Sequence, residues 1–155
     1  MKINQLLPVQ KPQCWSPDSP SLYSARLSVA ENNREIDSIL ESFGIRTISH
    51  SAEEGFKLNG NSLLLNGGCI HHDNGLLGAA TYEDAQYRQI LKMKEAGFNA
   101  VRTSHNHPSE VFLHACDSIG LLVIDEAFDG WRVAKKPHDY STLIDKYWKD
   151  DLSAL

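Results

Sequence analysis

Two short apolar runs without polar alternation lie in the second half of the chain, at residues 98–101 and 121–124, and a polar segment follows each. Short strands of this kind suit a parallel sheet that is buried on both faces. The segment between them predicts a helix that Ser109 caps and Gly120 ends. Its apolar positions recur at helical spacing, at Phe112, Ala115, Cys116 and Ile119. The pattern therefore predicts a strand, a helix and a second strand in succession.

A third apolar run, at residues 63–70, precedes this unit and is interrupted by two glycines. After it, a helix is predicted to begin at Thr81, with Asp84 completing a capping box, and to end at Gly97. Ser141 is the predicted cap of a last helix. The apolar positions of these two helices are Tyr87, Ile90, Leu91 and Met93, and then Ile144, Tyr147, Trp148, Leu152 and Leu155. Strands that alternate with helices predict an α/β fold with a parallel sheet.

The first third of the chain has a different pattern, because short alternating runs replace the helices. Residues 22–29 and 43–48 each predict a strand, and four prolines occur in the first 21 residues. Asn59-Gly60 stands between two further short runs and is the clearest hairpin turn in the sequence. Short strands with turns at this spacing predict part of a β-sandwich ahead of the α/β segment.

Titratable side chains follow each of the three predicted parallel strands. His71 and Asp73 follow the first, Arg102 and His105 the second, and Asp125 and Glu126 the third, with Trp131 shortly after them. Because the carboxyl ends of parallel strands meet at one edge of a sheet, we expect these groups to share a pocket. Trp131 could supply an aromatic platform for the apolar face of a sugar, or it could be part of the core.

Several of these residues have an alternative interpretation. Arg102 could form a structural ion pair with Asp125 or Glu126, since a buried guanidinium keeps its charge and needs a partner. The two carboxylates are adjacent and should point to opposite sides. By the same alternation His72 and His107 are weaker candidates than their neighbours, and His114 lies on the polar side of its helix.

The totals exclude some classes of partner. The chain has 155 residues, a net charge of −5 and no basic stripe, which argues against nucleic acid. No apolar run approaches the roughly 18 residues that span a bilayer, so no membrane partner is expected, and no feature indicates a compartment. The three cysteines lack CxxC spacing, so no disulfide framework is expected. Cys69 and Cys116 fall within strand and helix patterns and are predicted to be buried thiols.

Two other classes of function are open on the residues alone. His105-Asn106-His107, with His71 and Asp125, could supply the ligands of a zinc-dependent hydrolase. The chain could also be a carbohydrate-binding module without catalysis. Metal analysis would identify the first, and sugar affinity without turnover the second.

Several motifs in a constant order resemble the family 2 glycoside hydrolases, the group of β-galactosidases, β-glucuronidases and β-mannosidases. The motifs are WSPDSPSLY at 15–23, FGIRTI at 43–48, GFKLNG at 55–60, GCIHHD at 68–73, NAVRTSH at 99–105 and CDSIGLLVIDEAFDGW at 116–131. The resemblance covers nearly the whole chain. It implies that residues 1–54 end an immunoglobulin-like β-sandwich and that residues 55–155 form the first three strands and helices of a (β/α)₈ barrel.

The resemblance also implies roles for the clustered residues. His71 and His105 are similar to histidines that contact sugar hydroxyls, Arg102 to an arginine that supports the nucleophile, and Asp125 to a carboxylate near the same pocket. The substrate-binding set we predict is His71, Asp73, His105, Asp125 and Trp131, with Arg102 and Glu126 in support. No metal or other cofactor is expected.

The sequence departs from the family pattern at the positions that matter most for catalysis. The family's acid/base and nucleophile glutamates belong to later strands, Gly130 stands where some members bind magnesium through a glutamate, and His107 stands where proline is frequent. We therefore expect the chain to be a piece of a retaining exo-β-glycosidase that acts on an oligosaccharide or β-glycoside and to be inactive alone. An unpaired barrel edge should favour self-association.

Overall fold

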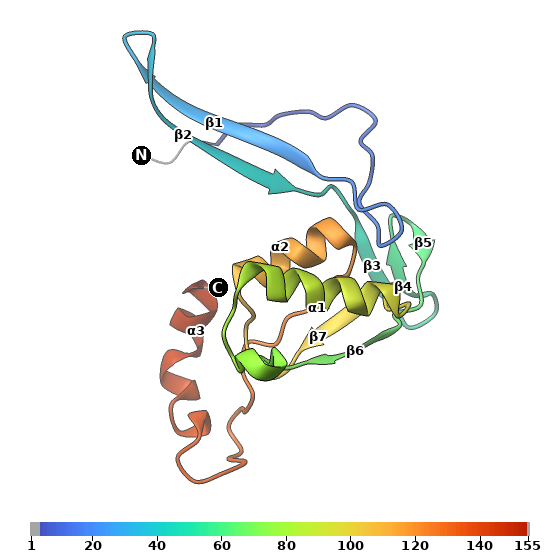
Figure 1. The fold of residues 1–155 in the computed structure, drawn as a ribbon, viewed down its shortest axis with the longest axis vertical. Helices are drawn as coiled ribbons and strands as arrows, with labels where there is room; N and C mark the ends of the chain where they lie inside the picture. The colour runs from blue at the N-terminus through green and yellow to red at the C-terminus, as the bar shows by residue number, and fades with distance from the viewer. Residues whose placement is uncertain (1–3, 155) are drawn as a thin grey trace. The chain divides into compact units, whose positions relative to one another are not determined.

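The protein divides into two compact units, and the boundary between them along the chain lies between Leu64 and Leu65. The computed structural model describes residues 4–154 and places three small sheets in chain order, two in the first unit and one in the second (Figure 1). The α/β fold predicted from the alternation of strands and helices is confirmed in the second unit. Each unit is described by itself below.

The first unit begins with a long antiparallel ribbon of two strands, β1 (Tyr23–Glu31) and β2 (Arg34–Phe43). The turn between them consists of Asn32 and Asn33, with φ of 50° and 60°. Two successive positive φ values match the right-handed twist of a hairpin, and Asn tolerates them better than most residues. The strand expected at 22–29 is therefore found, with one residue fewer at its start and two more at its end.

A second antiparallel sheet contains β3 (Ile48–Ser51), β4 (Gly55–Leu58) and β5 (Asn61–Ser62). Asn59 and Gly60 form the predicted turn, with φ of 52° and 79°. The Asn59 side chain accepts a hydrogen bond from the Thr47 amide and donates one to the Trp15 carbonyl, both at 3.0 Å. Trp15 is 1% exposed, so this turn is tied to the buried centre of the unit.

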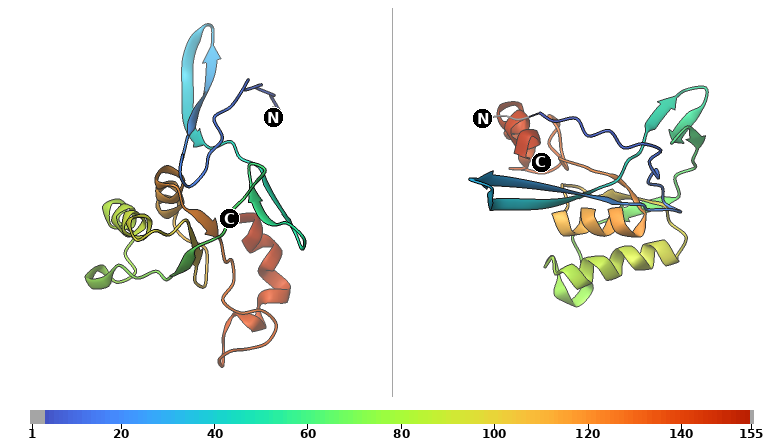
Figure 2. Two further views of the ribbon diagram at one scale, coloured as in Figure 1. Left: turned by 90° about the vertical axis from the view of Figure 1, so that its right-hand side faces the viewer. Right: turned by 90° about the horizontal axis from the view of Figure 1, so that it is seen from above.

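The second unit is built on a parallel sheet in the order β6 (Gly67–Ile70), β7 (Ala100–Thr103) and β8 (Leu122–Ile124). Two helices, α1 (Glu83–Glu95) and α2 (Glu110–Ile119), lie side by side on one face of it (Figure 2). The core between the helices and the sheet consists of Ile90, Val101, Phe112, Ala115, Cys116 and Leu121.

The ends of α2 are those expected from the sequence. The Ser109 hydroxyl accepts a hydrogen bond from the Phe112 amide at 3.2 Å, and Gly120 has φ of 91° and closes the helix. A left-handed residue at this position is most readily a glycine. Burial raises the pKa of the Cys116 thiol to about 12, which agrees with the prediction that it is part of the core. The same prediction is wrong for Cys69, which is exposed because its side chain lies on the face of β6 away from the helices' core residues.

The remaining helical segments are short or lie at the end of the chain. A 3₁₀ turn, η1 (Gly75–Leu77), precedes α1, and a second, η2 (Tyr140–Thr142), precedes α3 (Ile144–Ala154). Leu155, the last apolar position predicted for this helix, lies outside the described residues. Within residues 4–154, no helix combines the length and the apolar character that crossing a bilayer demands.

Four predictions about the position of strands and helix ends are wrong. Residues 43–48 do not form a strand, because β2 ends and β3 begins there, while Trp15 packs on Gly44 and donates its amide to the Ile45 carbonyl. The third apolar run is a strand only from Gly67 onward.

The other two errors concern helix caps. The N-cap residue of α1 is Tyr82 and not Thr81, and its side chain makes no capping hydrogen bond. Ser141 lies within η2, which Asp139 caps, and α3 begins three residues later at Ile144.

Candidate functional site

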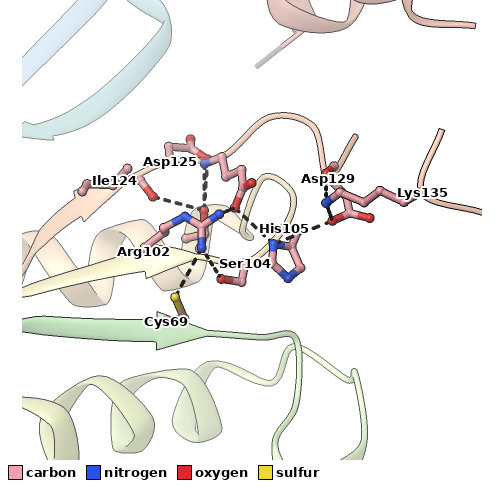
Figure 3. A network of polar contacts seen from close by, with 10 residues as sticks. Cys69, Arg102, Ser104, His105, Ile124, Asp125, Asp129 and Lys135 are labelled. Atoms are coloured by element: carbon pink, nitrogen blue, oxygen red, sulfur yellow. Dashed lines mark hydrogen bonds and ion pairs between the residues drawn. The ribbon is translucent and has the colours of Figure 1, made fainter. Parts of the chain in front are cut away.

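Arg102 is the centre of a polar network at the carboxyl edge of the parallel sheet (Figure 3). It pairs across the sheet with Cys69 on one side and Ile124 on the other. Its guanidinium lies 2.7 Å from the Glu126 carboxylate and 3.3 Å from both the Cys69 sulfur and the Ser104 hydroxyl. Of the two carboxylates considered for an ion pair with this arginine, Glu126 is the partner.

The contact between Arg102 and Cys69 affects both groups. The hydrogen bond to Cys69 is the main cause that raises the pKa of Arg102, and Glu126 adds to it. The pKa of Cys69 is lowered, first by a hydrogen bond from Ser104 and then by the guanidinium. The arginine is therefore a fixed positive charge that is held from three sides.

Asp125 and Glu126 point to opposite sides, as predicted, although β8 ends at Ile124 and neither residue lies in the strand. Glu126 faces Arg102, whereas the Asp125 carboxylate lies 3.4 Å from the Thr103 hydroxyl and 2.6 Å from Nδ1 of His107. Thr103 is 3% exposed, and its hydroxyl also accepts the Glu126 amide at 3.0 Å. One buried hydroxyl thus fixes the backbone from which both carboxylates project.

His105 lies between two carboxylates. Its Nδ1 atom is 3.5 Å from Glu126 Oε2 and 3.7 Å from Asp129 Oδ1, and its ring meets the edge of the His71 ring with 5.2 Å between centroids. A hydrogen bond from Lys135 lowers the pKa of Asp129, so this carboxylate is charged at neutral pH. The structure therefore brings together His71, His105 and the two carboxylates from two strand ends and the loop after β8.

His107 makes a contact that the sequence argument missed. The alternation used against it applies only to extended backbone, but β7 ends at Thr103 and the following residues bend. His107 is half-buried and close to Asp125, whereas His72 is exposed. One feature of the sequence could have indicated this role, because His107 stands where members of the family that the sequence resembles often have proline. His114 is exposed, as expected.

Asp73 and Trp131 lie at the margins of the network. The Asp73 carboxylate accepts the Gly75 amide at 2.9 Å and lines a cavity of about 590 Å³ between β6 and α1, which His71 also lines. Trp131 is 64% exposed, so it is not core. It lines a different cavity, of about 310 Å³, together with Arg102 and Glu126.

The contacts divide the four residues of the zinc hypothesis into two groups. His107 is paired with Asp125, and His105 faces Glu126 and Asp129. Within residues 4–154, no three His, Cys, Asp or Glu side chains come together in a way that could hold a metal ion. The observed distances therefore favour ion pairing among these groups.

Parallel strands that deliver imidazole, guanidinium and carboxylate groups to one edge are typical of α/β enzymes. Residues 51–146 match the family described as glycosyl hydrolases family 2, TIM barrel domain, and residues 1–46 match glycosyl hydrolases family 2. The chain belongs to glycosyl hydrolase family 2.

Two relatives illustrate the similarity in sequence. The chain is 43% identical over 151 residues to beta-galactosidase BoGH2A of Bacteroides ovatus, covering 97% of this chain and 18% of that protein. It is 40% identical over 147 residues to a putative beta-glucuronidase of Formosa agariphila, covering 94% of this chain and 14% of that protein. The chain thus spans less than a fifth of the length of these relatives.

Solved structures agree. A glycosyl hydrolase family 2 member from Bacteroides cellulosilyticus superposes with a TM-score of 0.87 at 53% identity, over 93% of this chain and 19% of that one. A beta-glycosidase from Bacteroides vulgatus superposes with a TM-score of 0.87 at 37% identity, over 94% and 19% respectively. The similarity therefore extends over both units of the chain.

Proposed function

We propose that this chain is part of a retaining exo-β-glycosidase that hydrolyses O-glycosidic bonds of β-galactoside type. Residues 55–155 would supply the first three strands and helices of a (β/α)₈ barrel, and residues 1–54 the last strands of an immunoglobulin-like β-sandwich. Family membership supports this proposal, as do the names of the relatives, which include a beta-galactosidase, a putative beta-glucuronidase and a beta-glycosidase.

The single observation that carries the proposal is the network of Arg102, Glu126 and His105. The ion pair at 2.7 Å fixes the direction of the guanidinium, and the histidine faces the same carboxylate at 3.5 Å. Sugar hydroxyls both donate and accept hydrogen bonds, so they suit a site with imidazole and carboxylate side by side. In this proposal His71, His105, Asp125 and Trp131 contact the sugar, Asp73 borders the site, and Arg102 and Glu126 support it.

The carboxylates of this chain are assigned to binding, not to bond cleavage. Retaining hydrolysis needs one carboxyl group that protonates the leaving oxygen and another that attacks the sugar, about 5–5.5 Å apart. Glu126 is engaged by Arg102, and Asp125 by Thr103 and His107. We propose that these contacts keep both carboxylates occupied, so that the chain alone hydrolyses nothing.

Two measurements on the purified chain test this function. The first is hydrolysis of aryl β-galactoside and aryl β-glucuronide by protein free of host enzyme, where we expect no turnover. Turnover that disappears in the Asp125→Asn or Asp73→Asn variant would contradict the assignment. In a longer polypeptide that includes the later strands, proton NMR of the first product should show the β anomer if the reaction proceeds with retention.

The second measurement is binding of methyl β-galactoside, followed by NMR of the His105 and Trp131 resonances. We expect weak binding that the His105→Ala variant abolishes. His114→Ala is the matched control, because His114 is exposed on α2, and it should leave binding unchanged. Equal loss of binding in both variants, or no binding by the unmodified chain, would remove the support for a sugar site.

The outer edge of β6 is the proposed route to self-association. Among the described residues, β6 pairs only with β7, so one row of its backbone groups has no strand partner. Open edges of this kind pair with other chains. Light scattering across a concentration series should show a rising mean mass, and a constant monomer mass would contradict this part of the proposal.

A further inference from the structure

One nitrogen of the His105 ring is buried against negative charge. Its Nδ1 atom is shut off from solvent and makes no hydrogen bond of ordinary length to any group within residues 4–154. The carboxylate oxygens nearest to it are Glu126 Oε2 at 3.5 Å and Asp129 Oδ1 at 3.7 Å, while the edge of the ring meets His71 (Figure 3). Two acidic side chains of the loop after β8 therefore face the same ring nitrogen.

These contacts determine which ring nitrogen carries the hydrogen. An ionised carboxylate can only accept hydrogen bonds, and so can an imidazole nitrogen that has no hydrogen. Glu126 is paired with Arg102 at 2.7 Å, and a hydrogen bond from Lys135 lowers the pKa of Asp129. A lone pair on Nδ1 would thus be buried against two acceptors, which is unfavourable. In the neutral His105 ring the hydrogen therefore belongs on Nδ1, and Nε2 keeps the lone pair.

Lys135 holds Asp129 in this arrangement. Its Nζ atom contacts Asp129 Oδ1 at 2.8 Å and also the main-chain carbonyl of Asp129. The Lys135 amide in turn donates to Asp139 Oδ2 at 2.6 Å. The Lys135 and Asp129 side chains are 55% and 60% exposed, and an ion pair this exposed adds little to stability. Its effect is therefore on the direction of the carboxylate.

The aromatic neighbours of Asp129 leave that direction to Lys135. The ring of Phe128 stacks on the ring of Tyr140 at 5.5 Å and anchors the backbone just before Asp129. Asp129 and these two rings border a cavity of about 320 Å³ beside Tyr140, so the carboxylate has open space on that side. Without the ammonium group, it could turn into this space and away from His105.

We propose that Lys135 is a positioning residue that acts through Asp129 to keep the hydrogen of His105 on Nδ1, so that Nε2 meets the sugar only as an acceptor. The contact with a sugar rests on the function proposed above, whereas the location of the hydrogen does not. A hydroxyl group can donate to Nε2. A carboxylate, an ether oxygen or a fluorine only accepts and finds no donor there. The ligand class is therefore a neutral sugar with a free hydroxyl at His105.

Long-range proton–nitrogen NMR of the ¹⁵N-labelled chain locates the hydrogen directly, because protonated and unprotonated ring nitrogens differ widely in chemical shift. Spectra are recorded at about pH 8.5, above the range in which an ordinary histidine takes up its second proton. His105→Ala identifies the signals of this ring among the seven histidines. We expect hydrogen on Nδ1 and none on Nε2. Hydrogen on Nε2, alone or on both nitrogens, would overturn the proposal.

Lysine variants test the positioning role. Lys135→Met removes the charge at similar length, so His105 should gain a population with hydrogen on Nε2 and methyl β-galactoside should bind about three- to tenfold more weakly. Lys135→Arg keeps a cation and should preserve both properties. Lys136→Met is the matched control, because Lys136 is exposed and contacts Asp139 through its backbone amide, at 3.2 Å. No effect of Lys135→Met, or an equal effect of Lys136→Met, would overturn the role of Lys135.

Both lysines are exposed, so these variants should fold, and circular dichroism checks that they do. Asp129→Asn provides a second route to the same answer. Its amide can donate to Nδ1, so the hydrogen of His105 should move to Nε2. A ring that keeps its hydrogen on Nδ1 in this variant would contradict the role of the carboxylate.

Sugar analogues test Nε2 as an acceptor. In a series of methyl β-galactosides with one hydroxyl replaced by hydrogen or by fluorine, the position that contacts His105 should lose the same affinity with either replacement. That loss should disappear in His105→Ala. Fluorine that preserves affinity where hydrogen loses it would show that His105 donates, and would overturn the acceptor role.

The outcomes separate the positioning role from the function proposed above. Hydrogen on Nδ1 that depends on Lys135, in a chain that binds no methyl β-galactoside, would support the positioning role and count against the sugar site. Binding of methyl β-galactoside by a chain with hydrogen on Nε2 of His105 would support the sugar site and overturn the positioning role.

Discussion

Alanine at Gly67 should destabilise the second unit, whereas alanine at the next residue should not. A Cβ at Gly67 would lie 2.4 Å from the Ala100 carbonyl oxygen and 2.9 Å from its carbon. These atoms belong to the backbone of β7, so no side chain can turn away to relieve the contact. A Cβ at Gly68 would meet only the tip of Met93, at 3.9 Å, which is ordinary packing.

The magnitudes follow from two opposing effects. Inserting a methyl group into a tight contact costs about 1–3 kcal/mol, and a backbone contact of this length falls toward the upper end. Replacing Gly by Ala restricts the unfolded chain, which stabilises the fold by about 0.4–1 kcal/mol where the backbone is compatible. We therefore expect Gly67→Ala to lose about 2 kcal/mol and Gly68→Ala to gain up to about 1 kcal/mol.

Urea unfolding of the parent chain and the two variants measures the difference in free energy of unfolding. An unchanged m value would show that the variants expose the same amount of surface on unfolding. In thermal scans each kcal/mol corresponds to about 4–8 °C for a domain of 60–100 residues. The reasoning would be refuted if Gly67→Ala were within about 0.5 kcal/mol of the parent chain, or if Gly68→Ala lost as much stability as Gly67→Ala.

Three further predictions concern side chains. Thr103→Val removes the hydroxyl from three strand-end hydrogen bonds and should cost about 1–3 kcal/mol in urea unfolding, whereas Thr103→Ser should cost less. Equal costs of the two variants would contradict the role of the hydroxyl. The hydrogen bond from Ser141 is the main cause that lowers the pKa of Asp139 to about 2. The stabilising effect of this carboxylate should therefore be complete above the pKa of the unfolded chain, near 3.9, and should be lost as pH falls through 2. Carboxyl NMR and acid unfolding can check this. Iodoacetamide at pH 7.5 should alkylate Cys69 well before Cys116, because the pKa of the Cys69 thiol is lowered and burial raises that of Cys116 to about 12. Comparable alkylation rates of the two thiols, measured by mass spectrometry, would contradict the described environments.

Where apolar periodicity and end signals agree, the sequence predicted the structure closely. The helix between Ser109 and Gly120 has both expected ends, and the strand after it begins only one residue later than expected. The reason is that the apolar residues of this helix and strand pack into the same core, so their spacing in the sequence reflects which side chains are buried. Asp125 and Glu126 also point in opposite directions as predicted, although both residues follow the end of β8 at Ile124.

Prediction failed where the chain leaves regular structure or has no buried side. β2 (Arg34–Phe43) is exposed along its whole length, so no alternation marked it. His107 was undervalued because strand alternation was extended past Thr103, where the backbone already bends. The cavity beside Tyr140 could not be predicted, because its lining comes from two loops, the 3₁₀ turn η2 and helix α3, and no periodic pattern in the sequence links these segments.

Asn59 meets two structural requirements that favour different residue types. As the first residue of a tight turn with φ of 52°, it would be replaced by glycine in a search for lower backbone strain. Yet its amide also bridges the Thr47 amide and the Trp15 carbonyl, and glycine would release both. Aspartate would keep the acceptor and lose the donor. Asparagine alone among these three residues meets both demands, which leaves this corner little freedom to vary in evolution or by design.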